Sequence, residues 1–311
     1  NHWMGFVDQV HANNHYPTFV WRYEPGIRGI NSWNGDVQIH ANHGRRAVYS
    51  TDLLTKAALN TIRIYRPSWE TGFRPFFLYL SFTAPHANNE LARKTGQGME
   101  VPTDYPYTSE RWPRAEKNKA AMITRLDNAV GQIMFKLKEY NMEEDTVIFF
   151  TSDNGPHQEG GNDPAFFRSA GPFRGIKRSL YEGGVRVPGL LEWPAKVKPG
   201  SITDFPAGTV DYVPTILSAI GLKMPETRPN DGIDLLPAIN GKIRERTKAM
   251  GFQSAGMASY VTHRYKLVSP KGNKKKKNDN PTQAQNKQLE LYDLIKDPHE
   301  KNNISAAHQP L

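Results

Sequence analysis

Residues 145–155 read DTVIFFTSDNG and indicate the fold class most directly. A short apolar run bounded by polar residues is typical of a strand buried on both faces. Residues 75–82, PFFLYLSF, form a second run of this kind. Between the two runs, residues 115–140 carry apolar side chains at spacings of three and four, which predicts a helix. Strand, helix and strand in this order indicate a βαβ unit and a parallel sheet.

We therefore expect an α/β fold, with a mixed, mostly parallel sheet sandwiched by helices. Further helices are predicted near residues 51–62 and 209–220, and a further strand near 187–193. Residues 260–268 and 290–294 alternate between apolar and polar side chains, which predicts a small antiparallel C-terminal subdomain. These patterns place a main α/β domain at residues 1–240 and the subdomain at residues 241–311.

Composition excludes several functional classes. The chain has no cysteine, which excludes disulfides and thiolate chemistry within it, and it has no apolar run long enough to span a membrane. The net charge is +9, and residues 241–280 hold 11 Lys and Arg against two Asp and Glu, so this segment accounts for all of it. The remaining residues carry no net charge, so the chain does not resemble a uniformly basic nucleic-acid-binding protein. The run Lys274–Lys277 is either a solvated loop or a polyanion-binding segment.

Two polar clusters follow the predicted strands. Asp153 and Asn154 provide adjacent carboxylate and amide oxygens, which suit Ca²⁺ or Mg²⁺, although Asp-Asn-Gly is also a common turn. His86 follows residues 75–82 directly, and it is either catalytic or structural. Carboxyl ends of parallel strands lie at one edge of a sheet, so both clusters are expected at that edge.

Residues 174–188, RGIKRSLYEGGVRVP, contain Lys177 within a glycine-rich loop. Its cationic side chains can bind an oxyanion, and the paired glycines allow tight backbone turns. The alternative is a solvated basic loop. Four further residues are candidates for substrate contact, each with a structural alternative: His157, Arg174, His11 and His15.

The ordered set of motifs resembles the type I sulfatase family of the alkaline-phosphatase-like superfamily. The matching order is Ala-Pro-His86, then Ser-Asp153-Asn154-Gly, then Lys177-x4-Glu-Gly-Gly-x-Arg-x-Pro. Later segments also resemble family landmarks, namely residues 8–17, 211–217, 231–236, 291–294 and 297–303.

The resemblance implies a role for each matching residue. Asp153 and Asn154 would be two of four protein ligands to Ca²⁺, and His86 and Lys177 would contact the sulfate or the leaving-group oxygen. Sulfate oxygens gain negative charge as the S–O bond breaks. A metal cation, Lys177 and His86 would stabilise that negative charge. His86 would protonate the departing alkoxide. The implied substrate is a sulfated small molecule or polysaccharide.

The chain departs from the family pattern at the nucleophile. The family uses a formylglycine made from Cys or Ser in a Cys/Ser-x-Pro-x-Arg motif, and this motif is absent. The paired aspartates that complete the metal site are also absent. We therefore expect a fragment truncated at both ends, inactive by itself, with the formylglycine and remaining ligands upstream of Asn1.

Other functions remain open at this stage. A phosphodiesterase or phosphonate hydrolase of the same superfamily would share the metal turn, whereas the Glu-Gly-Gly segment after Lys177 favours a sulfatase. A non-catalytic protein that binds sulfated polysaccharide through Lys274–Lys277 is a third possibility. Family habit implies a periplasmic or secreted location.

Overall fold

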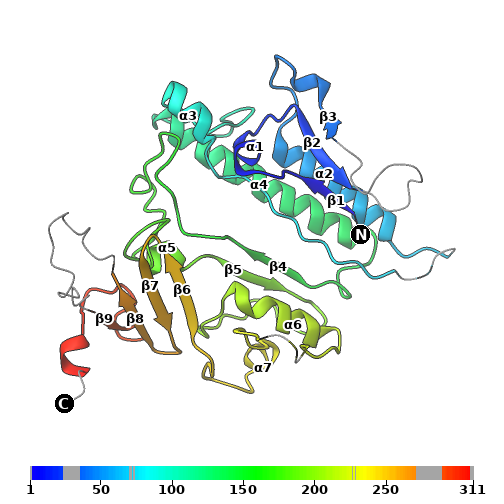
Figure 1. The fold of residues 1–311 in the computed structure, drawn as a ribbon. Helices are drawn as coiled ribbons and strands as arrows, with labels where there is room; N and C mark the ends of the chain where they lie inside the picture. The colour runs from blue at the N-terminus through cyan, green and yellow to red at the C-terminus, as the bar shows by residue number, and fades with distance from the viewer. Residues whose placement is uncertain are drawn as a thin grey trace. The chain divides into compact units, whose positions relative to one another are not determined.

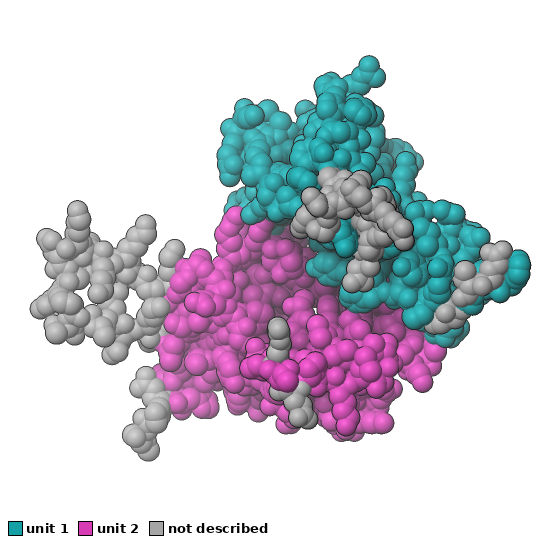
Figure 2. All heavy atoms as spheres, turned by 45° about the vertical axis from the view of Figure 1, so that its right-hand side comes forward, with its two compact units in different colours: residues 1–146, 157–167 teal, residues 147–156, 168–311 magenta. Residues whose placement is uncertain are grey.

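The computed structural model describes residues 2–23, 36–69, 72, 74–225, 227, 229–270 and 289–308 (Figure 1). The basic run Lys274–Lys277 therefore lies outside the described residues. The chain divides into two compact units, coloured separately in Figure 2. Unit 1 comprises residues 1–146 and 157–167, and unit 2 comprises residues 147–156 and 168–311. The predicted domain boundary at residue 240 stays a prediction.

Two long helices form the main packing layer of unit 1. Helix α2 spans Ser50–Tyr65 and buries Leu54, Ala58 and Ile62, which recur every four residues. Helix α4 spans Arg114–Glu139 and packs along α2 (Figure 1). Because residues at this spacing share one helix face, each helix presents an apolar stripe to its neighbour. Both helices were predicted from the sequence, and the structure confirms them.

The remaining elements of unit 1 are short. Strands β1 (Trp3–Gly5), β2 (Phe19–Tyr23) and β3 (Asp36–Gln38) form an antiparallel sheet in that order. The described part of unit 1 also contains the short helices α1 (Gln9–Asn13), η1 (His40–Asn42) and α3 (Asn89–Thr95). A buried cluster of Ala84, Ala87, Met99, Ala115 and Met122 joins the segment around His86 to helix α4.

The described residues of unit 2 form two separate sheets. Strand β4 (Ile148–Thr151) pairs with β5 (Gly189–Glu192), and both lie within predicted strands. Strands β6 (Met250–Ser254), β7 (Met257–Val261), β8 (Tyr265–Ser269) and β9 (Glu290–Asp293) form a four-stranded antiparallel sheet. This sheet confirms the predicted antiparallel C-terminal region.

Short helices connect these strands in unit 2. They are α5 (Glu182–Val185), η2 (Thr209–Asp211), α6 (Tyr212–Ala219), α7 (Leu236–Ile239) and η3 (Ser305–His308). Asp211 and Arg246 form a buried ion pair with both side chains fully inaccessible and with N–O distances of 2.7 and 2.8 Å. Asp211 also accepts from the backbone of Ile233, at 2.8 Å, so one buried carboxylate links three segments.

The predicted parallel sheet is not confirmed, since all paired strands in the described residues are antiparallel. Residues 75–82 are not assigned as a strand. Side chains in this segment alternate between half-buried and exposed, and Phe77 and Tyr79 are 74% and 81% exposed. A strand exists only where its backbone groups pair with a neighbour, and apolar composition does not supply that partner.

No helix in the described part of the chain has the length and apolar character needed to cross a membrane.

Candidate functional site

The Asp153–Asn154 turn lies directly after strand β4, as the sequence predicts. The Asn154 amide Nδ2 donates to the Gly155 carbonyl at 2.9 Å, and Ser152 Oγ donates to the Asn154 carbonyl at 3.1 Å. The Asp153 side chain is exposed. One carboxylate and one amide oxygen fit Ca²⁺ as two of its six to eight oxygen ligands. Within the described ranges, no group of three His, Asp or Glu side chains forms a metal site.

Backbone hydrogen bonds join this turn to the loop that carries Lys177. The Gly155 amide donates to the Gly184 carbonyl at 2.9 Å, and the Lys177 amide donates to the Pro156 carbonyl at 2.8 Å. The Gly183 amide donates to the Arg174 carbonyl at 2.7 Å, which closes the loop on itself. Two of the predicted polar clusters, Asp153–Asn154 and Lys177, are therefore brought together within unit 2.

Glycine is required where these two segments meet. A Cβ atom at Gly155 would lie 2.0 Å from the Gly183 carbonyl oxygen, and one at Gly183 would lie 2.1 Å from the Gly175 carbonyl oxygen. Both contacts involve backbone atoms, which move less easily than side chains. The paired glycines of the Lys177 loop thus have a physical reason: they allow two backbone segments to approach closely.

We expect Gly155→Ala to destabilise the chain by roughly 1–3 kcal/mol, because overpacking forces the backbone apart. Urea unfolding measures this change through the midpoint at constant slope. Gly131→Ala is the matched control, since Gly131 lies within α4 and a Cβ there meets nothing within 4 Å. The control should gain roughly 0.5–1 kcal/mol from helix propensity. Equal stability changes in both variants would show that the close approach is unimportant.

Buried charged residues that the sequence analysis did not single out hold the Lys177 loop in place. Glu182 is buried, and it accepts from Lys266 Nζ at 2.8 Å and from Arg186 Nε at 2.6 Å. Lys266 is fully buried and also lies 3.0 Å from Glu300 Oε1. The Glu182 amide donates to Glu300 Oε2 at 2.6 Å. These charges come from α5, strand β8 and the segment after strand β9, so no local spacing predicts their contact.

Arg174, a candidate for substrate contact, has several protein partners in unit 2. Its guanidinium lies 3.6 Å from the centre of the Tyr181 ring, and Nη1 donates to Tyr292 Oη at 2.9 Å. Nη1 also donates to the Glu300 carbonyl at 3.4 Å. These contacts fix the orientation of the partly exposed Arg174 guanidinium. A role for Arg174 in substrate binding stays a prediction.

His86 is held firmly in unit 1. It lies between Ala84 and Ala87, which are both buried. Its Nδ1 atom is 2.8 Å from the Ala87 carbonyl oxygen, which can only accept, so Nδ1 carries the proton. The remaining ring atom, Nε2, lies 3.6 Å from Glu159 Oε2, close enough to form an ion pair with the protonated ring. Nδ1 is therefore bonded to the backbone, and Nε2 is the ring atom that faces Glu159.

His157 lies beside His86 in the same unit, with the two rings stacked at 5.7 Å. Its Nε2 atom is 3.2 Å from the Pro85 carbonyl oxygen, and its Nδ1 atom accepts from the Glu159 amide at 3.2 Å. Burial lowers the pKa of His157. The His157 ring thus joins the loop that carries Glu159 to the segment that carries His86, and so holds these two side chains near each other.

The two N-terminal histidines serve the packing of unit 1. The His11 ring packs between Phe6 and Phe19, and its Nε2 atom lies 2.8 Å from the Phe19 carbonyl oxygen. His15 is completely buried, and its Nε2 atom lies 2.7 Å from the His86 carbonyl oxygen. Burial favours a role for His15 in supporting His86 over the direct substrate contact predicted for it, whereas a substrate role for His11 stays a prediction.

His15 should make stability depend on pH. Burial lowers its pKa from 6.5 to about 4, so between these values the unfolded chain binds the proton more readily. Stability should therefore fall as the pH drops from 6.5 to 4, by about 3 kcal/mol from this residue alone. Unfolding free energies of wild type and His15→Gln across this range test the effect. The variant should show a shallower slope across this range, because the His15 contribution is removed while the shifts at His157 and Glu182 remain; an unchanged slope would refute the assignment.

The site residues thus fall into two groups. Asp153, Asn154, Lys177 and Arg174 belong to unit 2, and His86, His157, His11 and His15 belong to unit 1. Sequence analysis gave Glu159 no role beside His86 and gave Glu182 no role in holding the Lys177 loop. Glu182 lies inside the Glu-Gly-Gly motif, which was the one signal available for it.

Two family models match long stretches of the chain. The family model described as "Sulfatase" matches residues 7–222. A second model, "N-sulphoglucosamine sulphohydrolase, C-terminal", matches residues 175–310. Because the first match covers more than half of the chain, the chain belongs to the sulfatase family.

Curated relatives carry sulfatase names. Human steryl-sulfatase is 30% identical over 270 residues, covering 76% of this chain and 42% of the relative. The N-acetylgalactosamine-6-sulfatase of Canis lupus familiaris is 29% identical, covering 75% and 42%. The N-acetylgalactosamine-6-O-sulfatase of Bacteroides thetaiotaomicron is 28% identical, covering 75% and 44%. The chain spans less than half the length of each of these relatives.

The fold is shared with solved structures. The structure described as Ps i-CgsB in complex with k-i-k-neocarrahexaose aligns with a TM-score of 0.71 at 24% identity. The alignment covers 99% of this chain and 62% of that chain. At this identity the similarity shows the fold alone.

Proposed function

We propose that the complete protein hydrolyses sulfate esters of a sulfated carbohydrate. The observation that carries this proposal is the pair of backbone hydrogen bonds that fix the Asp153–Asn154 turn against the Lys177 loop. Oxygens that could ligate a metal, on a turn bonded through its backbone to the loop that carries a lysine, suit an anionic oxyester. Membership of the sulfatase family supports a sulfate ester as the group that is cleaved. Relatives named N-acetylgalactosamine-6-sulfatase support a sugar as the molecule that carries it.

The proposed chemistry assigns each residue one task. Lys177 balances the negative charge of the sulfate oxygens, which grows as the S–O bond to the sugar breaks. His86, whose Nε2 atom lies 3.6 Å from Glu159 Oε2, gives a proton from Nε2 to the departing sugar oxygen. Ca²⁺, when held by Asp153, Asn154 and further ligands, supplies additional positive charge at the sulfate. We propose that a formylglycine nucleophile and those ligands come from sequence outside these 311 residues.

The proposed substrate and location follow from the family. A sulfated polysaccharide is the proposed natural partner, in the periplasm or outside the cell. The 311-residue chain by itself is proposed to be inactive, because it has neither a cysteine nor a Ser-x-Pro-x-Arg motif to provide the nucleophile.

The deciding experiment is an assay of the complete protein with four substrates. These are an N-acetylgalactosamine 6-sulfate disaccharide, a steryl sulfate, 4-nitrophenyl sulfate and 4-nitrophenyl phosphate. Release of sulfate from the disaccharide, suppressed by a Ca²⁺ chelator and restored by Ca²⁺, is the expected result. Preference for the phosphate ester would replace the proposal with a phosphatase-like activity, and preference for the steryl sulfate would reject the sugar. Binding of sulfated polysaccharide without any turnover would leave a non-catalytic role.

A further inference from the structure

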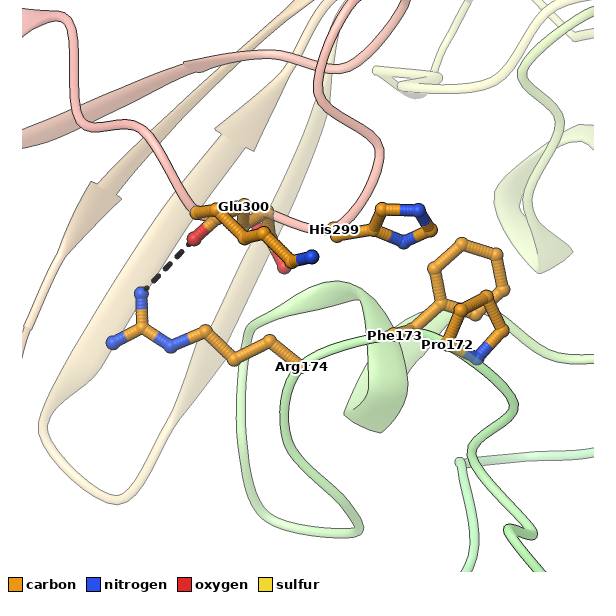
Figure 3. A pocket seen from close by; sticks show the side chains of 6 residues that line it. Pro172, Phe173, Arg174, His299 and Glu300 are labelled. Carbon is orange, nitrogen blue, oxygen red and sulfur yellow. Dashed lines mark hydrogen bonds between the residues drawn. The ribbon is translucent and has the colours of Figure 1, made fainter.

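An open pocket of about 420 Å³ lies beside the Lys177 loop, within unit 2 (Figure 3). Six residues line it: Pro172, Phe173, Arg174, His299, Glu300 and Lys301. The volume falls within the range of about 300–1,000 Å³ that is common for small-molecule sites. Arg174 and Lys177 belong to the same loop and are separated by two residues, so the pocket adjoins the segment proposed to bind the sulfate.

The pocket combines an apolar wall with cationic and polar groups. Figure 3 shows Phe173 and Pro172 on the side of His299, with Arg174 opposite them and bonded to the Glu300 carbonyl. The His299 and Phe173 rings lie 6.1 Å apart. His299 Nδ1 is shielded from solvent and has no hydrogen-bond partner in the described structure. Lys301 is exposed. The Arg186 guanidinium lies 4.6 Å from the centre of the Phe173 ring, so the apolar wall is a partly covered ring. Apolar contact beside cationic groups suits a sugar that carries an anionic group.

The pocket wall is rigid because Glu300 is anchored in the core. Its side chain is fully buried and contacts Lys266 Nζ and the Glu182 amide. Its backbone has a φ of +55°, which is unfavourable for a residue with a side chain. Such a conformation persists where surrounding contacts enforce it, and it is often found at binding sites. The buried contacts of Glu300 thereby fix the backbone that carries His299 and Lys301 at the pocket.

We propose that this pocket binds a second sugar ring that bears a sulfate group, next to the sugar whose sulfate is removed. Phe173 and Pro172 contact the ring, while Arg174, His299 and Lys301 contact its sulfate. This inference rests on the proposed hydrolysis of sulfated carbohydrate and adds a preference for substrates that carry a sulfate on the adjoining sugar.

The test compares two chondroitin oligosaccharides with the complete protein. Both carry a 6-sulfate on a terminal galactosamine, and only one carries a sulfate on the adjoining uronate. Wild type should show the lower KM for the doubly sulfated probe. Lys301→Ala should raise that KM about threefold, and His299→Ala/Lys301→Ala about tenfold, as expected for partly exposed charge contacts. The KM for the singly sulfated probe and kcat for 4-nitrophenyl sulfate should stay within twofold of wild type.

Lys198→Ala is the matched control, because Lys198 is exposed and does not line the pocket. It should leave both KM values unchanged. An equal KM for both probes in wild type would overturn the proposal. So would a double variant that loses activity equally on 4-nitrophenyl sulfate, since that would indicate a structural role.

A direct titration separates this inference from the proposed function. If wild type hydrolyses none of the sulfate esters, the proposed function fails, and calorimetry with the same two oligosaccharides still tests the pocket. A Kd for the doubly sulfated probe that rises about tenfold in the double variant, and not in Lys198→Ala, supports the pocket. A Kd unchanged by the double variant overturns it.

Discussion

Lys177→Ala in the complete protein should lower kcat/KM for a sulfate ester by roughly 10²–10³, the usual loss when one charge-stabilising donor is removed from a site. The physical reason is that the sulfate oxygens gain negative charge during S–O cleavage, and the ammonium group would no longer balance it. The loss should appear mainly in kcat, because the interaction strengthens in the transition state. Steady-state kinetics with the 6-sulfate disaccharide give both constants.

Two companion variants make this result specific. Lys198→Ala removes an exposed lysine elsewhere in unit 2 and should leave kcat/KM unchanged. Lys177→Arg keeps the charge but changes its shape, and it should retain part of the activity. If Lys177→Ala loses less than tenfold, while the variant remains folded by circular dichroism, Lys177 does not bind the reacting sulfate.

Lys266→Met should destabilise the chain by about 3–5 kcal/mol, since removing one partner of a buried ion pair leaves an uncompensated charge. In this case two carboxylates, Glu182 and Glu300, would lose their shared cation. Although burial alone would raise the pKa of Glu182, Lys266 and Arg186 hold it below its ordinary value, whereas burial raises the pKa of Glu300. Urea unfolding at pH 7 measures the loss.

Removing the charge of a carboxylate as well should restore part of this stability. Lys266→Met/Glu300→Gln leaves Glu182 with Arg186 as its remaining cation and should be more stable than Lys266→Met alone. Lys198→Met, at an exposed position, should change the unfolding free energy by less than about 0.5 kcal/mol. A loss below 1 kcal/mol for Lys266→Met would mean that the buried charges are solvated in solution.

Some parts of the fold could be predicted because their signals are local. The spacing of Leu54, Ala58 and Ile62 defines one face of α2, and the alternation in residues 260–268 falls on β7 and β8. Residues 75–82 misled the prediction because an apolar run shows only that a segment avoids water. The same run says nothing about which strand pairs with it or in which direction.

The residues of the candidate site also divide into those that local signals predict and those that they do not. Asp153, Asn154 and Lys177 could be found from residue type, turn chemistry and family resemblance. The roles of Glu159, Lys266 and Glu300 could not, because each acts through a partner far away in the sequence, and the Glu-Gly-Gly motif indicated Glu182 without its buried partner Lys266. Lys266 and Glu182, for example, are separated by 84 positions and meet through a contact of 2.8 Å.

The sequence by itself determined the family, the main helices and the residues whose side chains could take part in catalysis or binding. These features depend on side-chain type and short-range order. Tertiary structure alone decided which glycines permit close backbone contact, how the buried charges beneath Lys177 are paired, and which way the strands run. The physical reason is that burial, charge compensation and strand pairing are properties of segments that meet in space. Their free energies exist only once the chain has folded and excluded water from the contact.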